Sequence, residues 1–235
     1  MSRAATTALI VLVIGLVGSR SSAQVNMEKL RRADAEKVAS ATLELDLAVR
    51  TGNVETFEVG VGGRIDYFGE SATVLLVGEG DLGWQGGERY SNNALVHLRQ
   101  VYRRQSRMQP ELFAQTDYDK SRNLAFRGLI GGGLRIGLYQ ARTAQFWLGS
   151  AYMFEHERLD PEAADTHSRR SSVHRSSNYL SSKIQFNEQT ALAWTLYLQP
   201  QFDDPADLRF LSEGDLEVKL RPSVLLVTTS SMRYD

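Results

Sequence analysis

The feature that most constrains the fold of this chain is an alternation of apolar and polar residues with a period of two. The alternation runs from about residue 40 to the last residues. A period of two puts successive side chains on opposite faces of a β-strand, so the pattern predicts strands. Glycine-containing turn signals such as Gly52-Asn53 and Gly86-Gly87 separate the segments. About eleven strands are expected, at 43–49, 57–67, 73–84, 94–103, 111–118, 126–138, 146–155, 173–187, 190–202, 208–220 and 224–234.

The length of these segments favours a membrane barrel over a soluble sandwich. If there are twelve strands, about 18 residues are available for each strand and turn, and a tilted membrane strand needs roughly 9–11 in the hydrocarbon. Strands of soluble sandwiches are shorter, at roughly 5–6 residues. We therefore predict an all-β fold over residues 39–235, an antiparallel up-and-down transmembrane β-barrel of about 10–12 strands.

The first residues have the layout of a secretory signal peptide. Arg3 precedes an apolar run from Ala8 to Gly18, and small residues at Ser21 and Ala23 suit a cleavage site. We predict a cleaved signal peptide at 1–23, because the run is about half the ~20 residues that a spanning helix needs; the alternative is an uncleaved anchor. The charged residues 24–38 are expected to form a short periplasmic leader or helix. No later segment is apolar enough to span a membrane as a helix, so a membrane domain must consist of strands. We predict that this domain lies in the cell outer membrane.

Charge and cysteine content narrow the classes of partner. The formal net charge is −1, which argues against a nucleic-acid partner, because such proteins carry a basic patch. The chain has no cysteine, so no disulfide supports a small core, and a closed hydrogen-bonded sheet is the natural alternative.

The two faces of the expected strands differ in charge. An Arg or Lys at the lipid midplane costs about 2–4 kcal/mol, which is enough to turn the charged face inward. Charges of both signs on that face predict a paired network inside the barrel. Its expected members are Glu58, Arg64, Asp66, Arg99, Arg103, Arg127, Arg135 and Glu155.

Short motifs give little sign of catalysis or of a cofactor. The segment from Gly78 to Gly83 matches GxGxxG but is followed by strand and turn residues, whereas a dinucleotide site requires a helix there. No histidine has metal-ligand spacing. His156 makes a Ser–His hydrolase conceivable, with a serine from a neighbouring strand, but the sequence specifies none. We predict no catalytic residue, no cofactor and no metal, so the chain is not expected to be an enzyme.

A basic cluster formed by Arg169, Arg170 and Arg175 flanks the longest expected loop. Counted from a periplasmic N-terminus, this loop falls outside the cell, where arginines meet lipopolysaccharide phosphates. A solvated loop is the favoured alternative. The expected partners are outer-membrane lipid, lipopolysaccharide and the outer-membrane assembly machinery.

Three short segments resemble a bacterial family of unknown function, the salt-induced outer membrane proteins. They are Gly52-Asn53, the stretch from Tyr102 to Asp119, and Phe126-Arg127 with Gly131-Gly132-Gly133-Leu134. The resemblance covers most of residues 40–235. It implies a Gram-negative outer-membrane barrel without known catalytic residues, linked to salt or envelope stress.

The end of the chain departs from that class. Outer-membrane barrels usually finish on an aromatic residue that the assembly machinery reads, whereas this chain ends Arg233-Tyr234-Asp235. Their strand number is usually even, and eleven is odd. Either the closing strand is missing, or residues 24–38 or 203–212 supply another strand.

Three functions remain open. The first is an outer-membrane barrel that is structural or a narrow pore for small solutes or ions. The second is a soluble periplasmic barrel that binds an apolar ligand as lipocalins do, with its apolar face inward. The third is an outer-membrane lipid-modifying hydrolase.

Overall fold

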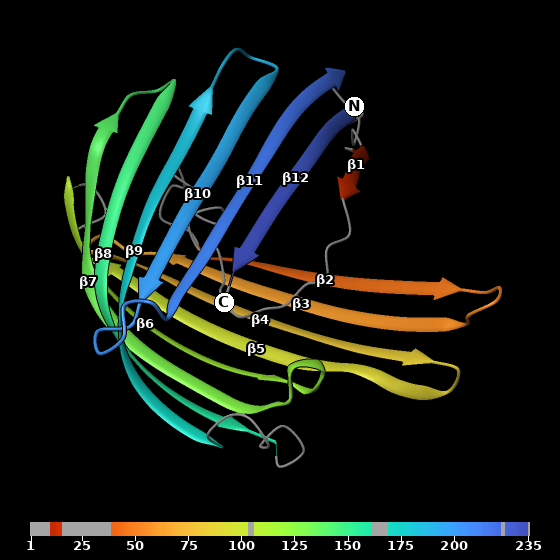
Figure 1. Cartoon of the computed structure of the whole chain (residues 1–235). Helices are drawn as coiled ribbons and strands as arrows, with labels where there is room; N and C mark the ends of the chain where they lie inside the picture. Colours follow the sequence, from red (N-terminus) through yellow and green to blue (C-terminus); the bar gives the residue numbers. More distant parts are fainter. Residues whose placement is uncertain (1–9, 16–38, 103–105, 161–168, 222–223, 235) are drawn as a thin grey trace.

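The described residues fold into one curved twelve-stranded sheet, with neighbours in the order β1-β12-β11-β10-β9-β8-β7-β6-β5-β4-β3-β2 (Figure 1). The computed structural model describes residues 10–15, 39–102, 106–160, 169–221 and 224–234. The strands are β1 (Ile10–Gly15), β2 (Ala39–Arg50), β3 (Thr56–Phe68), β4 (Ala72–Gln85), β5 (Glu88–Tyr102), β6 (Met108–Asp119), β7 (Leu124–Gln140), β8 (Ala144–Leu159), β9 (Arg170–Gln185), β10 (Thr190–Pro200), β11 (Leu208–Arg221) and β12 (Val224–Tyr234), and a short 3-10 helix, η1 (Lys120–Arg122), follows β6.

Strands β2 to β12 form an up-and-down meander, because each pairs antiparallel with the next along the chain. The prediction of about eleven antiparallel strands is confirmed, and the long strands follow the expected segments closely. Residues 203–207 belong to the connection between β10 and β11. The alternative in which 203–212 supplies an additional strand is therefore wrong.

Hairpin geometry explains one of the glycine pairs. Gln85 pairs with Glu88, so the turn between β4 and β5 contains only two residues. These are Gly86 and Gly87, with φ of 57° and 86°, in the left-handed region that glycine adopts without steric cost. Positive φ at both positions is the geometry that matches the twist of a two-residue hairpin.

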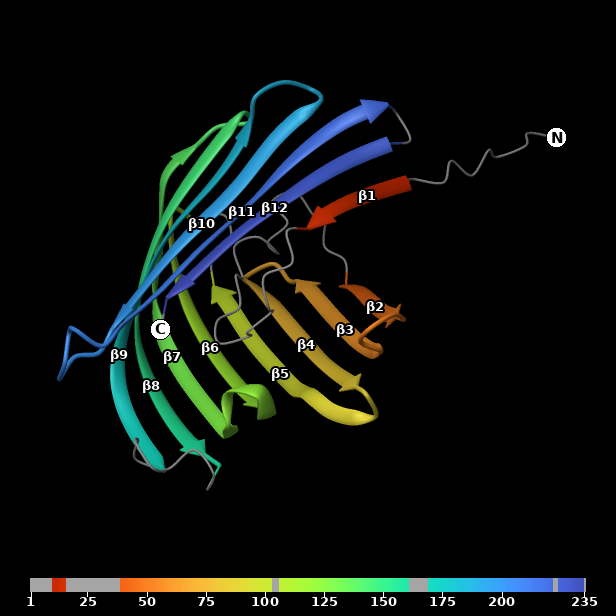
Figure 2. The same cartoon turned by 45° about the vertical axis from the view of Figure 1, so that its right-hand side comes forward.

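The two edges of the meander are not joined to each other in the described part of the chain. β2 pairs with β3 alone, whereas β12 pairs with β11 and, in parallel, with β1. Figures 1 and 2 show β1 beside β12 on the side that faces β2. Residues 10–15 lie in the apolar run of the predicted signal peptide, which stays a prediction, and the expected leader at 24–38 is outside the described residues. Each of the eleven strands from β2 to β12 runs opposite to its neighbour. The outermost two, β2 and β12, therefore run in the same direction.

The concave side of the sheet holds the buried side chains. Curvature is strong enough for β9 to contact β6 through side chains, although β7 and β8 lie between them. One apolar cluster joins Phe113, Ala151 and Met153, and another joins Tyr179, Tyr197 and Leu211. Both clusters lie among charged and amide side chains of the same face.

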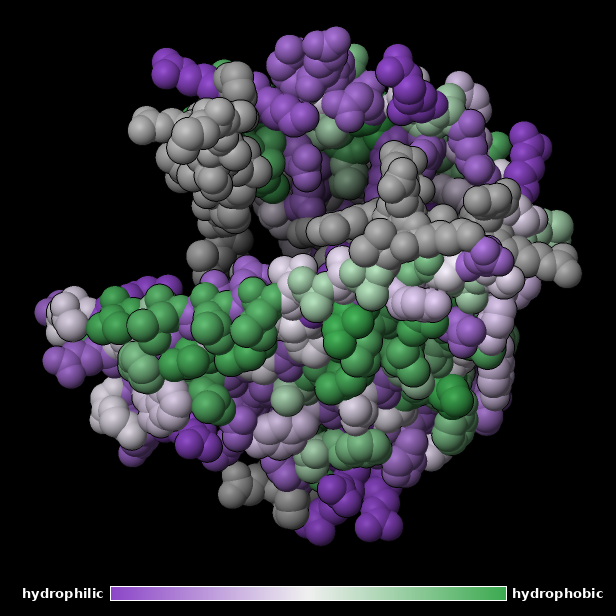
Figure 3. Space-filling view, turned by 180° about the vertical axis from the view of Figure 1, so that it is seen from behind, coloured by the Kyte–Doolittle hydropathy of each residue, from purple (hydrophilic) through white to green (hydrophobic). Residues whose placement is uncertain are grey.

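The convex side carries large apolar side chains that are left exposed. They come from every described strand of the meander, including Leu43 (72% exposed), Leu98 (45%) and Ile130 (62%). Figure 3 shows such side chains gathered across the back of the sheet. Contiguous exposed apolar surface of this kind is rare on soluble monomers and marks a surface that something covers. No helix in the described ranges is long and apolar enough to cross a membrane.

Candidate functional site

The candidate site is the ion-paired interior of the concave face. Strand alternation sends every second side chain there, and the burial pattern of β6, which alternates at each residue, shows the two faces directly. Five members of the expected charged network are buried on this face: Asp66, Arg99, Arg127, Arg135 and Glu155.

Of the other three members, the two that the structure describes lie closer to solvent. Arg64 is partly buried and donates two hydrogen bonds of 2.7 Å to the carboxylate of Asp66 on the same strand. Glu58 lies near the β2–β3 hairpin, where it accepts from Arg50 at 3.0 Å and from the Tyr90 hydroxyl. Arg103 is outside the described residues.

One centre of the interior is Glu111 on β6, whose side chain is 1% exposed. Its carboxylate lies 3.3 Å from Nη1 of Arg99 on β5, its neighbour strand. It also accepts from the Tyr179 hydroxyl of β9, at 3.2 and 3.3 Å to its two oxygens. The Arg99 guanidinium lies over the Phe113 ring, 5.0 Å from its centroid. Glu111 therefore joins opposite parts of the curved sheet.

A second centre is Glu155 on β8, whose side chain is also 1% exposed. It pairs with Nη1 of Arg209 on β11, two strands beyond β9, and its other oxygen lies 3.7 Å from Nε of Arg175. Arg175 also donates to both carboxylate oxygens of Asp207, at 3.0 and 2.9 Å. Arg209 reaches Glu157 at 3.5 Å. Two cations and three carboxylates thus satisfy one another, which a buried charge requires.

A chain of polar contacts links β5, β6 and β7. His97 Nδ1 lies 3.0 Å from Oε1 of Gln115, whose amide donates to Asp117 at 3.2 Å. Asp117 accepts from Nε of Arg127 at 3.0 Å and lies 3.0 Å from its Nη2. Arg127 is among the most buried side chains of the described chain, so the pair with Asp117 neutralises a charge away from water.

Arg135 is held differently, near the opposite end of β7. It donates to Oε1 of Gln109 at 3.3 Å, and its guanidinium lies 3.7 Å from the centroid of the Trp147 ring. Stacking on an aromatic face stabilises a guanidinium that has left water.

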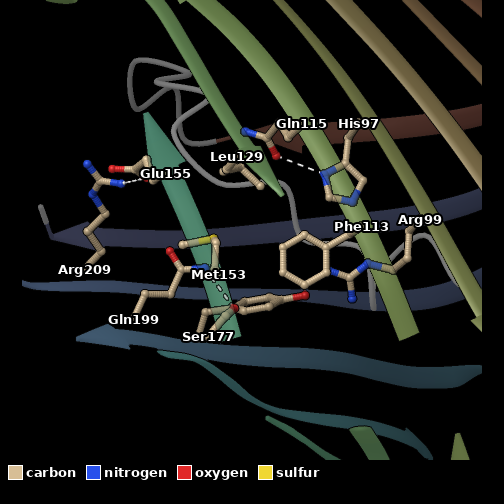
Figure 4. A pocket seen from close by; sticks show the side chains of 11 residues that line it. His97, Arg99, Phe113, Gln115, Leu129, Met153, Glu155, Ser177, Gln199 and Arg209 are labelled. Atoms are coloured by element: carbon tan, nitrogen blue, oxygen red, sulfur yellow. Dashed lines mark hydrogen bonds and ion pairs between the residues drawn. The ribbon is translucent and has the colours of Figure 1, made fainter. Parts of the chain in front are cut away.

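A small cavity lies between these groups in the described part of the chain. It has a volume of about 20 Å³, which is room for about one water molecule. Figure 4 shows His97, Arg99 and Phe113 facing Met153, Glu155 and Arg209 across it. Residues that line it are His97, Arg99, Phe113, Gln115, Leu129, Met153, Glu155, Ser177, Tyr197, Gln199 and Arg209.

Sequence reasoning missed several members of this interior. Phe113 has the same parity as Glu111 and Gln115, so the pattern itself carried the signal for it. The sequence places Arg175 in the basic cluster beside the loop, but the residue lies buried on the concave face with Glu155. No sequence signal joins Tyr179 to Glu111 or Arg209 to Glu155, because these contacts depend on the curvature of the sheet.

The GxGxxG segment and His156 both lie within strands of the sheet. Gly78 and Gly83 lie inside β4, so no helix begins after that motif. Nδ1 of His156 lies 2.8 Å from Oγ of Ser172 on the neighbouring strand β9. Within the described residues no partner orients its Nε2, the third element of a Ser–His site. Those residues include no group of three or more His, Cys, Asp or Glu that would hold a metal ion.

Together these observations define an all-β protein with one antiparallel meander, an ion-paired concave face and an apolar convex face. Comparison with known proteins gives its family. The chain belongs to the family described as protein of unknown function, DUF481, which matches residues 43–235. No curated protein and no solved structure matches it.

Proposed function

We propose that this chain is an outer-membrane protein whose sheet spans the bilayer with its convex face against lipid. In this proposal its role is structural, and its interior is closed to solutes. Outer-membrane lipid, lipopolysaccharide and the assembly machinery are its proposed partners. Induction by salt or envelope stress is a separate proposal that comes from the family resemblance alone.

The single observation that carries the proposal is the distribution of burial between the two faces. Ion pairs such as Asp117–Arg127 are buried on the concave face, whereas Leu98 and Ile130 are exposed on the convex face. A soluble barrel has the opposite arrangement, because apolar area removed from water contributes about 25 cal/mol per Å². Against lipid, the apolar side chains of the convex face are no longer exposed to water. A charged side chain that faced lipid would be destabilising, so the charged side chains must face inward.

Side-chain contacts that cross the concave interior support a structural role over a pore. Glu111 and Glu155 each join strands that are not neighbours, so their contacts cross the space that a solute would use. The cavity between Arg99, Glu155 and Arg209 has a volume of about 20 Å³, which is room for about one water molecule and not for a hydrated ion.

Neither alternative gains support from the concave face. A barrel that binds an apolar ligand needs an apolar cavity of roughly 300–1,000 Å³. The cavity observed is small and has Arg99, Glu155 and Arg209 in its lining. For a hydrolase, the Ser172–His156 pair has no third group to orient it among the described residues. The absence of enzymatic activity stays a prediction.

Membrane extraction followed by conductance tests the proposal. The full chain should remain in the outer-membrane fraction after alkaline carbonate treatment and should migrate differently on gels before and after heating. Reconstituted in a planar bilayer, it should give no steady conductance. Release into the soluble fraction would end the membrane proposal, and stable single-channel steps would replace the structural role by a pore.

The membrane proposal also requires partners within the hydrocarbon for the free backbone groups of β2, and for those of β12 once β1 is removed with the proposed signal peptide. Each unpaired backbone group in hydrocarbon costs several kcal/mol. Direct pairing of these two strands gives a parallel seam, since they run in the same direction.

A further inference from the structure

The first half of β9 is polar on both of its faces. Arg175, Ser177 and Tyr179 are buried on the concave side, so the residues between them point outward. The outward positions before Leu180 are polar in every case, whereas neighbouring β10 presents Leu196 and Leu198 on the same side. These outward residues of β9, here called the polar stripe, are Arg170, Ser172, His174, Ser176 and Asn178.

Most of the polar stripe is paired through side chains of β8 and β9. Asn178 lies 2.8 Å from Ser150 Oγ and donates to Ser176 at 2.8 Å. His174 contacts the Tyr152 hydroxyl, and Ser172 contacts His156 at 2.8 Å. Pairing of this kind removes much of the cost of placing polar groups on a lipid-facing surface.

The arginines at the end of the stripe are the exception. Arg158 of β8 and Arg170 of β9 are directly opposite each other in the β-sheet register, and both are exposed. Like charges directly opposite across two strands are destabilising. Neither has an acidic partner within the part of the chain that the structure describes.

The space around these arginines forms a shallow outward cleft. It has a volume of about 350 Å³ and is lined by Phe126, His156, Arg158 and Arg170. Phe126 pairs with Arg158 in the register, so the aromatic ring and both guanidinium groups belong to one row across β7, β8 and β9. An anion with several oxygens would relieve the repulsion, and the fork of N–H donors on arginine matches phosphate geometry.

We propose that Arg158 and Arg170 bind a phosphate of a lipid headgroup, with Ser172 and His156 beside them contacting sugar hydroxyls of the same headgroup. This inference rests on the proposed membrane location, in which the β8–β9 hairpin lies at the outer surface. Hydroxyl and imidazole groups both donate and accept, which suits a saccharide. The ligand class is therefore a phosphorylated glycolipid of the surrounding leaflet.

The test uses the full chain in detergent micelles and lipid A as the probe, with thermal unfolding as the readout. Lipid A should raise the Tm of the wild type in a saturable manner. The double variant R158Q/R170Q should bind at least tenfold more weakly, because two charge-assisted contacts are lost. The matched control R142Q/R221Q removes the same charge from exposed positions at the opposite strand ends and should bind as the wild type does.

Two further arms separate the sources of phosphate. Dephosphorylated lipid A and inorganic phosphate should each give less than a tenth of the Tm shift at equal concentration. If inorganic phosphate raises the Tm of the wild type as much as lipid A does, and does not raise the Tm of R158Q/R170Q, the lipid assignment is overturned. Equal binding by R158Q/R170Q and R142Q/R221Q overturns the site itself.

Failure of the proposed lipid A site and failure of the proposed membrane location give different results. A protein that stays in the membrane fraction but binds lipid A independently of Arg158 and Arg170 contradicts only the site. A protein released by carbonate whose lipid A binding depends on both arginines contradicts only the membrane location.

Discussion

Two glutamates with arginine partners, Glu155 and Glu58, differ in how far their ion pairs are buried. Glu155 balances both Arg175 and Arg209, which come from different strands, and its own carboxylate is out of water. Glu58, by contrast, has a side chain that is 36% exposed and pairs with Arg50, whose side chain is 59% exposed. Since screening by water weakens an exposed pair, the two glutamates are predicted to differ sharply in their effect on stability.

Glu155→Gln should lower the free energy of unfolding by about 3 kcal/mol, since a buried pair that loses one partner costs roughly 3–5 kcal/mol. The lower end is expected because Arg175 keeps Asp207 and Arg209 keeps Glu157. Urea unfolding in micelles, followed by tryptophan fluorescence, measures the change. Glu58→Gln is the matched control and should cost less than about 1 kcal/mol. Equal losses in the two variants would mean that the interior is wet and the pairs are screened.

At the scale of elements, the approach of β8 to β9 depends on a glycine. A Cβ added to Gly149 would lie 2.0 Å from Cε1 of Tyr179, whose hydroxyl contacts Glu111. The absence of a side chain at Gly149 therefore leaves room for the Tyr179 ring, whose hydroxyl reaches Glu111 on β6.

Gly149→Ala should cost about 1–3 kcal/mol of unfolding free energy, as overpacking does in a filled interior. In a Tyr179→Ala background the same change should cost less than about 0.5 kcal/mol, because the clash partner is gone. Gly63→Ala is the control, since its nearest neighbour atom would be 4.0 Å away. Equal costs of Gly149→Ala in both backgrounds would show that the two residues do not meet.

Strand β9 also shows why some elements resist sequence analysis. Its residues Arg170 to Asn178 are polar at nearly every position. The sequence there has no apolar–polar alternation that would indicate which side chains face inward. Only its register with β8 separates Arg175 from the outward arginines. Strands β5, β6 and β7 alternate clearly, and there the predicted faces agree with the burial of Arg99, Gln115 and Arg127.

At the scale of the whole molecule, the sequence predicts the antiparallel order of the strands but not the curvature of the sheet. Local alternation and turn glycines determine where strands begin and end, which is why eleven antiparallel strands were expected and found. Contacts such as Tyr179–Glu111 join residues 68 positions apart, and their existence depends on curvature summed over several strands. The parallel pairing of residues 10–15 with β12 had no signal in the pattern either.

The medium that the convex face meets distinguishes a membrane-spanning sheet from a soluble one. The chain has no cysteine, so single cysteines can be introduced one at a time along β3, from Val59 to Tyr67, without a background signal. Each carries a fluorophore, and the chain is reconstituted into vesicles that contain lipids with a quencher on the acyl chain. Val61 and Ile65 are 46% and 50% exposed on the convex face, whereas Asp66 is 3% exposed on the concave face.

The measurement is quenching by the lipid-borne quencher at each position. Strong quenching at 59, 61, 65 and 67, with weak quenching at 60, 62, 64 and 66, is the predicted result. Strong quenching at the even positions, or no alternation between neighbouring positions, would contradict the claim that the apolar face meets lipid and the charged face is enclosed.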